Sequence, residues 1–69
     1  MKKNYFKIKE INEEIRVYKI VKFDLLILIN HCIQYHVEYE NFKKVFLDLE
    51  KKIDEKEDIL KKLVGGKNV

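Results

Sequence analysis

Three residues near the middle of the chain, Cys32, His36 and Glu40, carry side chains that can bind a metal ion. They are spaced by four residues, so on a continuous helix the thiol, the imidazole and the carboxylate would line up on one face. A structural zinc site needs four such ligands, and this row supplies three. A second chain could double the set, but a small buried thiol also packs at a helix interface without further function. We therefore expect Cys32 to be structural, and we predict no metal site and no cofactor.

Cys32 and His36 could also be a catalytic nucleophile and its base. The sequence contains no Ser or Thr, and its only glycines, Gly65 and Gly66, come near the end of the chain. A Gly-rich turn that could form an oxyanion hole or cradle a phosphate is therefore missing, and 69 residues leave little chain to enclose a pocket. We predict that the protein is not an enzyme.

The element that positions these residues is predicted to be a helix over residues 24–64. Asp24 is a good N-cap residue, and Gly65 stands where a C-terminal cap is expected. Apolar residues recur in alternating steps of three and four, which is typical of a coiled coil, and Lys56 is the only charged residue in the row. The row consists of Leu25, Leu28, Cys32, Tyr35, Tyr39, Phe42, Phe46, Leu49, Ile53, Lys56, Leu60 and Leu63. We expect one long helix or two nearly collinear ones, with Asn41 as the place where a helical hairpin turn would interrupt the row.

Residues 5–23 allow two interpretations. The segment 15–23 is rich in β-branched and aromatic residues and 5–9 alternates, which favours a β-hairpin with its turn at 12–14. The competing interpretation is a helix, because the turn has no Gly and apolar residues also recur at helical spacing. That helical row would be Ile8, Ile11, Ile15, Tyr18 and Val21. The fold class is thus mainly α, with an N-terminal β-hairpin or helix packed on a coiled-coil-like C-terminal helix.

The stretch from Arg16 to Asp24, as a strand followed by helices, resembles in outline the ribbon-helix-helix repressors. In that family a dimer pairs one strand from each subunit and places the ribbon in the major groove of DNA. The resemblance covers this stretch alone. The chain departs from the family where a Gly-containing turn and a Ser/Thr cap usually precede the second helix.

Length and charge limit the architecture. Sixty-nine residues allow one domain, which we divide into the N-terminal segment 5–23, the helix 24–64 and a tail 65–69. A core of this size gives marginal stability, and one cysteine closes no internal disulfide, so help from an oligomer or a partner is expected. The longest uncharged stretch, residues 25–37, is shorter than the roughly 20 residues of a membrane span. We expect a cytoplasmic protein without a membrane span.

Most of the positive charge lies at the N-terminus, because residues 1–23 carry a net +4 and residues 24–64 a net −2. The basic N-terminal segment is therefore the candidate for binding nucleic acid through phosphate contacts. The residues that would make them are Lys7, Lys9, Arg16, Lys19 and Lys22. Arginine is the residue that most often makes specific contacts to bases, and Arg16 is the only one in the chain. We therefore expect little sequence-specific recognition of bases.

Four aromatic residues follow one another along the predicted apolar row, and aromatic residues are enriched at protein interfaces. We predict a partner-binding surface formed by Tyr35, Tyr39, Phe42, Phe46, Leu49 and Ile53. The function expected is a small non-catalytic protein-interaction module that binds a larger protein, a second copy of itself, or both. An inhibitor or regulator from a phage or mobile element is one setting for such a module. The alternative is a transcriptional regulator that binds nucleic acid through its N-terminal segment and dimerises through its helix.

Overall fold

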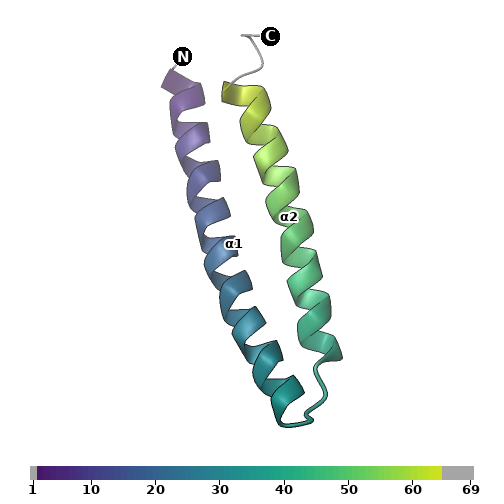
Figure 1. The fold of residues 1–69 in the computed structure, drawn as a ribbon. Helices are drawn as coiled ribbons and strands as arrows, with labels where there is room; N and C mark the ends of the chain where they lie inside the picture. Colours follow the sequence, from purple (N-terminus) through teal and green to yellow (C-terminus); the bar gives the residue numbers. More distant parts are fainter. Residues whose placement is uncertain (1, 65–69) are drawn as a thin grey trace.

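The structure is a computed structural model that describes the backbone of residues 2–64 and the side chains of residues 5–64. Within this range it consists of two helices, α1 (Lys2–Gln34) and α2 (Glu40–Val64), which fold back on each other as a hairpin (Figure 1). The predicted tail 65–69, including the Gly65 cap, lies outside the described residues. The expectation of a mainly helical protein is confirmed.

The prediction of an N-terminal β-hairpin was wrong, and the helical alternative is confirmed. Residues 5–23 belong to α1, and residues 2–64 contain no strand. Residues 5–23 are helical because their apolar residues recur at heptad spacing and the same spacing continues in the second half of α1. One side of the 33-residue helix can therefore pack against α2. Asp24 is consequently an interior residue of α1 and not an N-cap. The outline resemblance to ribbon-helix-helix proteins fails with the strand on which it depended.

The expectation of one continuous helix over 24–64 was also wrong, because α1 ends at Gln34 and α2 begins at Glu40. The predicted interruption at Asn41 lies just past the real turn, since Asn41 is the second residue of α2. The backbone N–H of Val37 donates to the carbonyl of Cys32 (2.8 Å), and that of His36 donates to the carbonyl of Ile33 (3.3 Å). With His36 at φ 60°, these two hydrogen bonds make a Schellman motif.

The start of α2 is capped by the side chain of one loop residue, Glu38. The backbone N–H of Glu40 donates to Glu38 Oε2 (3.0 Å), which satisfies one of the donors left free in the first turn. The loop of residues 35–39 then runs back beside the last turns of α1 (Figure 1). A helix stop and a helix start within five residues make the chain reverse direction instead of continuing collinearly.

The two helices pack through one row of side chains from each, both in alternating steps of three and four. The row on α2 agrees with the sequence prediction from Phe46 to Leu63. On α1 the row contains Ile29 (9% exposed) where the sequence analysis placed Leu28, which is 41% exposed. The buried or half-buried residues of the α1 row are Ile8, Ile11, Ile15, Tyr18, Lys22, Leu25, Ile29 and Cys32.

The compact part of the core lies in the half of the hairpin away from the loop. Ile11, Ile15 and Ile53 form a buried cluster, against which Tyr18, Leu60 and Leu63 pack. Ile29, Cys32 and Leu49 are also buried, but they lie outside this cluster. Only six apolar side chains among the described residues are buried, so the hairpin has a small core.

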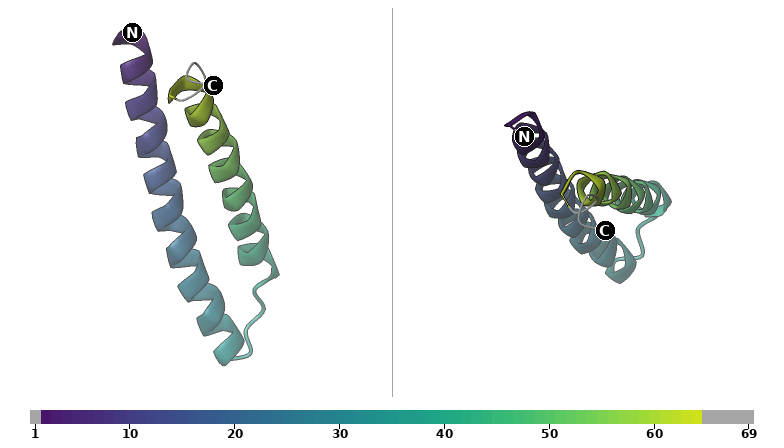
Figure 2. Two further views of the ribbon diagram at one scale, coloured as in Figure 1. Left: turned by 45° about the horizontal axis from the view of Figure 1, so that its top comes forward. Right: turned by 90° about the horizontal axis from the view of Figure 1, so that it is seen from above.

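Three ion pairs between the helices fix the antiparallel register. Lys56 Nζ lies 2.9 Å from Glu14 Oε1, Lys22 Nζ lies 3.2 Å from Glu50 Oε2, and Lys19 Nζ lies 3.4 Å from Glu57 Oε2. Seen from above, the two helices are inclined to one another (Figure 2, right). The molecule is a rod of 51 × 19 × 14 Å, and neither described helix is long and apolar enough to cross a membrane.

Candidate protein-interaction surface

The predicted partner-binding residues do not share one surface. Leu49 and Ile53 are buried between the helices, where Ile53 belongs to the core cluster. Phe46 is half-buried in the same interface and Phe42 lies at its edge, whereas Tyr35 is exposed in the loop. Tyr39, just before α2, is half-buried. The apolar row of α2 from Phe46 onward therefore faces α1 inside the hairpin, and binding of a partner by these six residues stays a prediction.

A much larger apolar surface lies on α1, in the half of the hairpin near the loop. From Val17 to Ile33 this helix is apolar around most of its circumference, whereas α2 covers only one side of it. A helix that is apolar all round is normally buried on all sides. The apolar residues of this segment that stay exposed are Val17, Ile20, Val21, Phe23, Leu26, Ile27, Leu28 and Ile33.

The helical repeat sorts these exposed residues into two groups on either side of the hairpin. Five of them share one side of α1, at about 130° around the helix from the row that faces α2. We call this group the Phe23 stripe: Ile20, Phe23, Leu26, Ile27 and Ile33. The second group, the Val21 row, contains Val17, Val21 and Leu28 and lies on the opposite flank.

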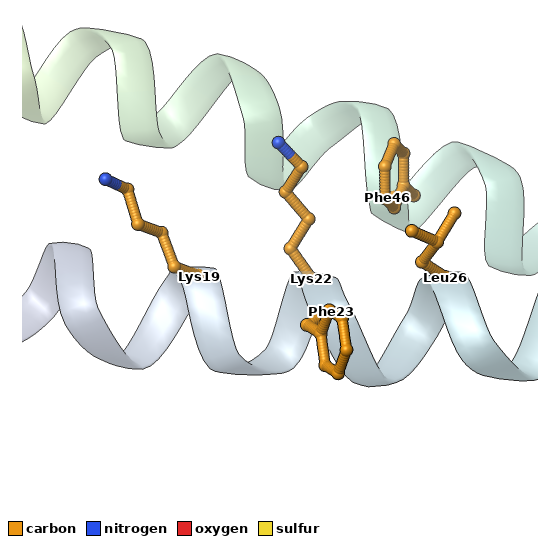
Figure 3. Close-up of a pocket in the computed structure, with 5 residues that line it drawn as sticks. All are labelled: Lys19, Lys22, Phe23, Leu26 and Phe46. Atoms are coloured by element: carbon orange, nitrogen blue, oxygen red, sulfur yellow. The ribbon is translucent and has the colours of Figure 1, made fainter.

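The Phe23 stripe borders an open groove between the helices, lined by Lys19, Lys22, Phe23, Leu26 and Phe46 (Figure 3). Lys22 crosses the groove, with its ammonium 5.4 Å from the centre of the Phe46 ring and also paired with Glu50. Leu26 points towards α2, but the Phe23 ring turns away from it and is 62% exposed. The residues at the floor of the groove thus make their contacts within the hairpin, whereas the Phe23 ring is left exposed to solvent.

The predicted nucleic-acid-binding residues are largely engaged with acidic side chains. Arg16 pairs with Glu13 (3.0 Å) on the same helix, and Lys19 and Lys22 pair with acids of α2. Lys7 and Lys9 lie further towards the N-terminus on exposed positions of α1. Because three of the five cations are next to a carboxylate, their positive potential is reduced at the surface.

The structure does not assemble the metal-binding row of Cys32, His36 and Glu40. Cys32 is a buried residue of α1, His36 lies in the loop, and Glu40 begins α2. The alignment required a continuous helix, which the turn interrupts. Among the described residues, no group of three or more His, Cys, Asp or Glu side chains is placed to hold a metal ion.

Comparison with protein-family models, with curated proteins and with solved structures gave no match. The interpretation of the surface therefore depends on the residues themselves. The sequence did not predict the Phe23 stripe, because residues 15–23 were expected to form a strand, which divided the stripe between two elements. Counting apolar residues around one helix from 17 to 33 is the signal that would have found it.

Proposed function

We propose that this chain is a non-catalytic protein-interaction module, and that it binds through the apolar loop half of α1. The observation that supports the proposal is the exposure of apolar side chains on two flanks of one helix between Val17 and Ile33. Contiguous apolar patches of this kind are uncommon on isolated monomers and are typical of protein-binding surfaces. The chain would act by occupying a surface of its partner, as small inhibitors and regulators do.

The chemistry of the surface favours a partner that presents an apolar helix or groove. The Phe23 stripe offers aliphatic and aromatic side chains at positions three and four residues apart, which is the pattern of a helix docking into a hydrophobic groove. Lys22 and Lys19, which border the stripe, are already paired with Glu50 and Glu57. A partner therefore does not need acidic residues opposite these lysines in order to bind the stripe.

Site-specific photo-crosslinking tests the proposal. A photoreactive amino acid at Phe23 should crosslink to protein in cells of the source organism, because the ring is exposed and central to the stripe. The matched control carries the same group at Lys51, an exposed residue on the polar outer side of α2. Protein adducts at position 23 and not at 51 would support the proposal. Nucleic-acid adducts at either position, or equal protein adducts at both, would contradict it.

A further inference from the structure

The accessible surface of the chain is larger than a compact monomer of its mass would expose. The accessible surface of the chain is 5849 Å², whereas a compact monomer of 8.4 kDa is expected to expose about 4,600 Å². The excess of about 1,200 Å² exceeds the roughly 800 Å² that each partner loses in a standard stable interface. Covering one flank of the hairpin with another helical hairpin would bring the surface close to that of a compact protein.

We propose that a second copy of the chain occupies the Phe23 stripe, so that two hairpins form an antiparallel four-helix dimer. This inference rests on the proposed function and names the partner of the same surface. A two-fold dimer requires a self-complementary patch. The stripe meets this requirement, since an axis near residue 25 would place Phe23 of each copy against Ile27 of the other.

Charge determines the relative direction of the two α1 helices. The stripe lies on the same side of α1 as Arg16 at one end and Gln34 at the other. A parallel pair would bring the two Arg16 side chains together, and such like-charge contacts are unfavourable. An antiparallel pair places Arg16 beside the partner's Gln34, close to Glu38 in the loop and Glu40 at the start of α2. The antiparallel arrangement is therefore the one that the charges favour.

Charged residues within the stripe segment do not oppose this pairing. Between Ile20 and Gln34, α1 contains only Lys22 and Asp24 as Asp, Glu, Lys or Arg. Lys22 turns towards α2 and pairs with Glu50 at 3.2 Å. Asp24 lies at the border of the stripe, four residues after Ile20 and three before Ile27, and its side chain is exposed. Lys19, one turn before Phe23 on the same side of α1, pairs with Glu57 at 3.4 Å, so both ammonium groups beside the stripe keep a carboxylate partner within the hairpin.

The first test is the mass of the purified protein in solution. Light scattering should give about twice the 8.4 kDa of one chain across the micromolar to millimolar range. A Phe23→Lys/Ile27→Lys variant should give the mass of one chain while circular dichroism still shows helix, because both side chains point away from the core. A Val17→Lys/Leu28→Lys variant, altered on the Val21 row, should remain dimeric. A wild-type protein of single-chain mass throughout, or a dimer unaffected by the first variant, would overturn the inference.

The second test determines the direction of the helices without altering Phe23. In a Cys32→Ala background, chains with Arg16→Cys and chains with Gln34→Cys are mixed and treated with a short thiol-specific crosslinker. The antiparallel dimer should yield the mixed product and little Arg16→Cys self-product. Preferential self-linking of the Arg16→Cys chains would overturn the antiparallel arrangement. A monomeric chain that still gives protein adducts at position 23 in cells would refute self-association and leave the proposed function intact.

Discussion

Lys56 occupies a core position of α2, yet its ammonium lies 2.9 Å from Glu14 Oε1 at the edge of the interface. The sequence analysis recognised Lys56 as the one charged residue in the apolar row of residues 25–63, and the structure supplies its partner from α1. A charge in such a row favours the pairing register in which it meets an opposite charge. The ion pair thus contributes to the choice of one antiparallel register over its neighbours.

The same pair predicts how stability depends on alkaline pH. The hydrogen bond to Glu14 is the main reason that the pKa of Lys56 is raised above its ordinary 10.5, and the charges of nearby acids add to it. Because the folded state holds the proton more tightly, the stabilisation is complete below pH 10.5 and is lost as the pH rises through the folded pKa. Wild type should therefore be more stable than Lys56→Gln at pH 8, and the difference should shrink above pH 10.5.

Urea unfolding followed by circular dichroism at a series of pH values measures this difference. Lys51→Gln is the matched control, since Lys51 is an exposed residue on the outer side of α2. Its stability relative to wild type should change little with pH. A wild-type advantage over Lys56→Gln that grows above pH 10.5 would contradict the prediction.

The loop contains a residue in an unfavourable backbone conformation. His36 has φ 60° at the C′ position of the Schellman motif, where glycine is usual. The left-handed conformation costs a residue with a Cβ atom roughly 1–2 kcal/mol. Glycine avoids this cost, but it loses more conformational entropy on folding, which offsets part of the gain. His36→Gly should therefore stabilise the hairpin by about 0.5–1 kcal/mol. His36→Ala keeps the Cβ atom and should bring no comparable gain, and thermal unfolding of both variants would separate a backbone effect from a side-chain effect.

The buried cluster predicts a sharp contrast between two isoleucines of α2. Ile53 is 5% exposed and packs with Ile11 and Ile15, whereas Ile59 is 41% exposed. Ile53→Ala should cost about 2–5 kcal/mol, a large part of the stability of so small a protein. Ile59→Ala, the same chemical change outside the core, should cost less than about 1 kcal/mol. Chemical unfolding at one fixed protein concentration gives both values, and similar losses would contradict the position of the core.

Two adjacent residues of α1 test where its packing row lies. Ile29→Asn should destabilise the hairpin by about 2 kcal/mol or more, because it places an amide among buried apolar groups. Leu28→Asn changes an exposed side chain and should stay within about 0.5 kcal/mol of wild type. The reverse order in thermal unfolding would favour the row predicted from the sequence over the one in the structure.

These two residues also show how far the sequence could predict the fold. In α2 the apolar row is narrow and the other sides are charged, so periodicity alone located Phe46 to Leu63 correctly. In α1 both Leu28 and Ile29 continue an apolar pattern, because the helix is apolar nearly all round, and spacing could not choose between them. The sequence also contained the helical row from Ile8 to Tyr18, but the β-branched residues of 15–23 favoured a strand. Packing of this row against α2 outweighs that local preference in the structure.

The turn was the hardest feature to predict. Residues 35–39 contain no Gly, Pro or Asn, the residue types that usually mark a chain reversal. The chain reverses there through a left-handed histidine and a glutamate that caps the next helix, Glu38. Because residues 24–64 were expected to form one long helix or two nearly collinear ones, Leu49 and Ile53 were predicted to face a partner, whereas in the structure they are buried between α1 and α2.

The position of the buried cluster has a consequence for motion. Ile11, Ile15 and Ile53 hold the hairpin together at the end opposite its loop, although these residues are far apart in sequence. On the loop side of this cluster, Ile29, Cys32 and Leu49 are buried but lie outside it. The free energy of local opening should therefore be lowest next to the loop. Backbone amides near residues 26–33 should then exchange hydrogen faster than those near residues 11–18. The covalent connection through the loop therefore does not by itself make that end of the hairpin rigid.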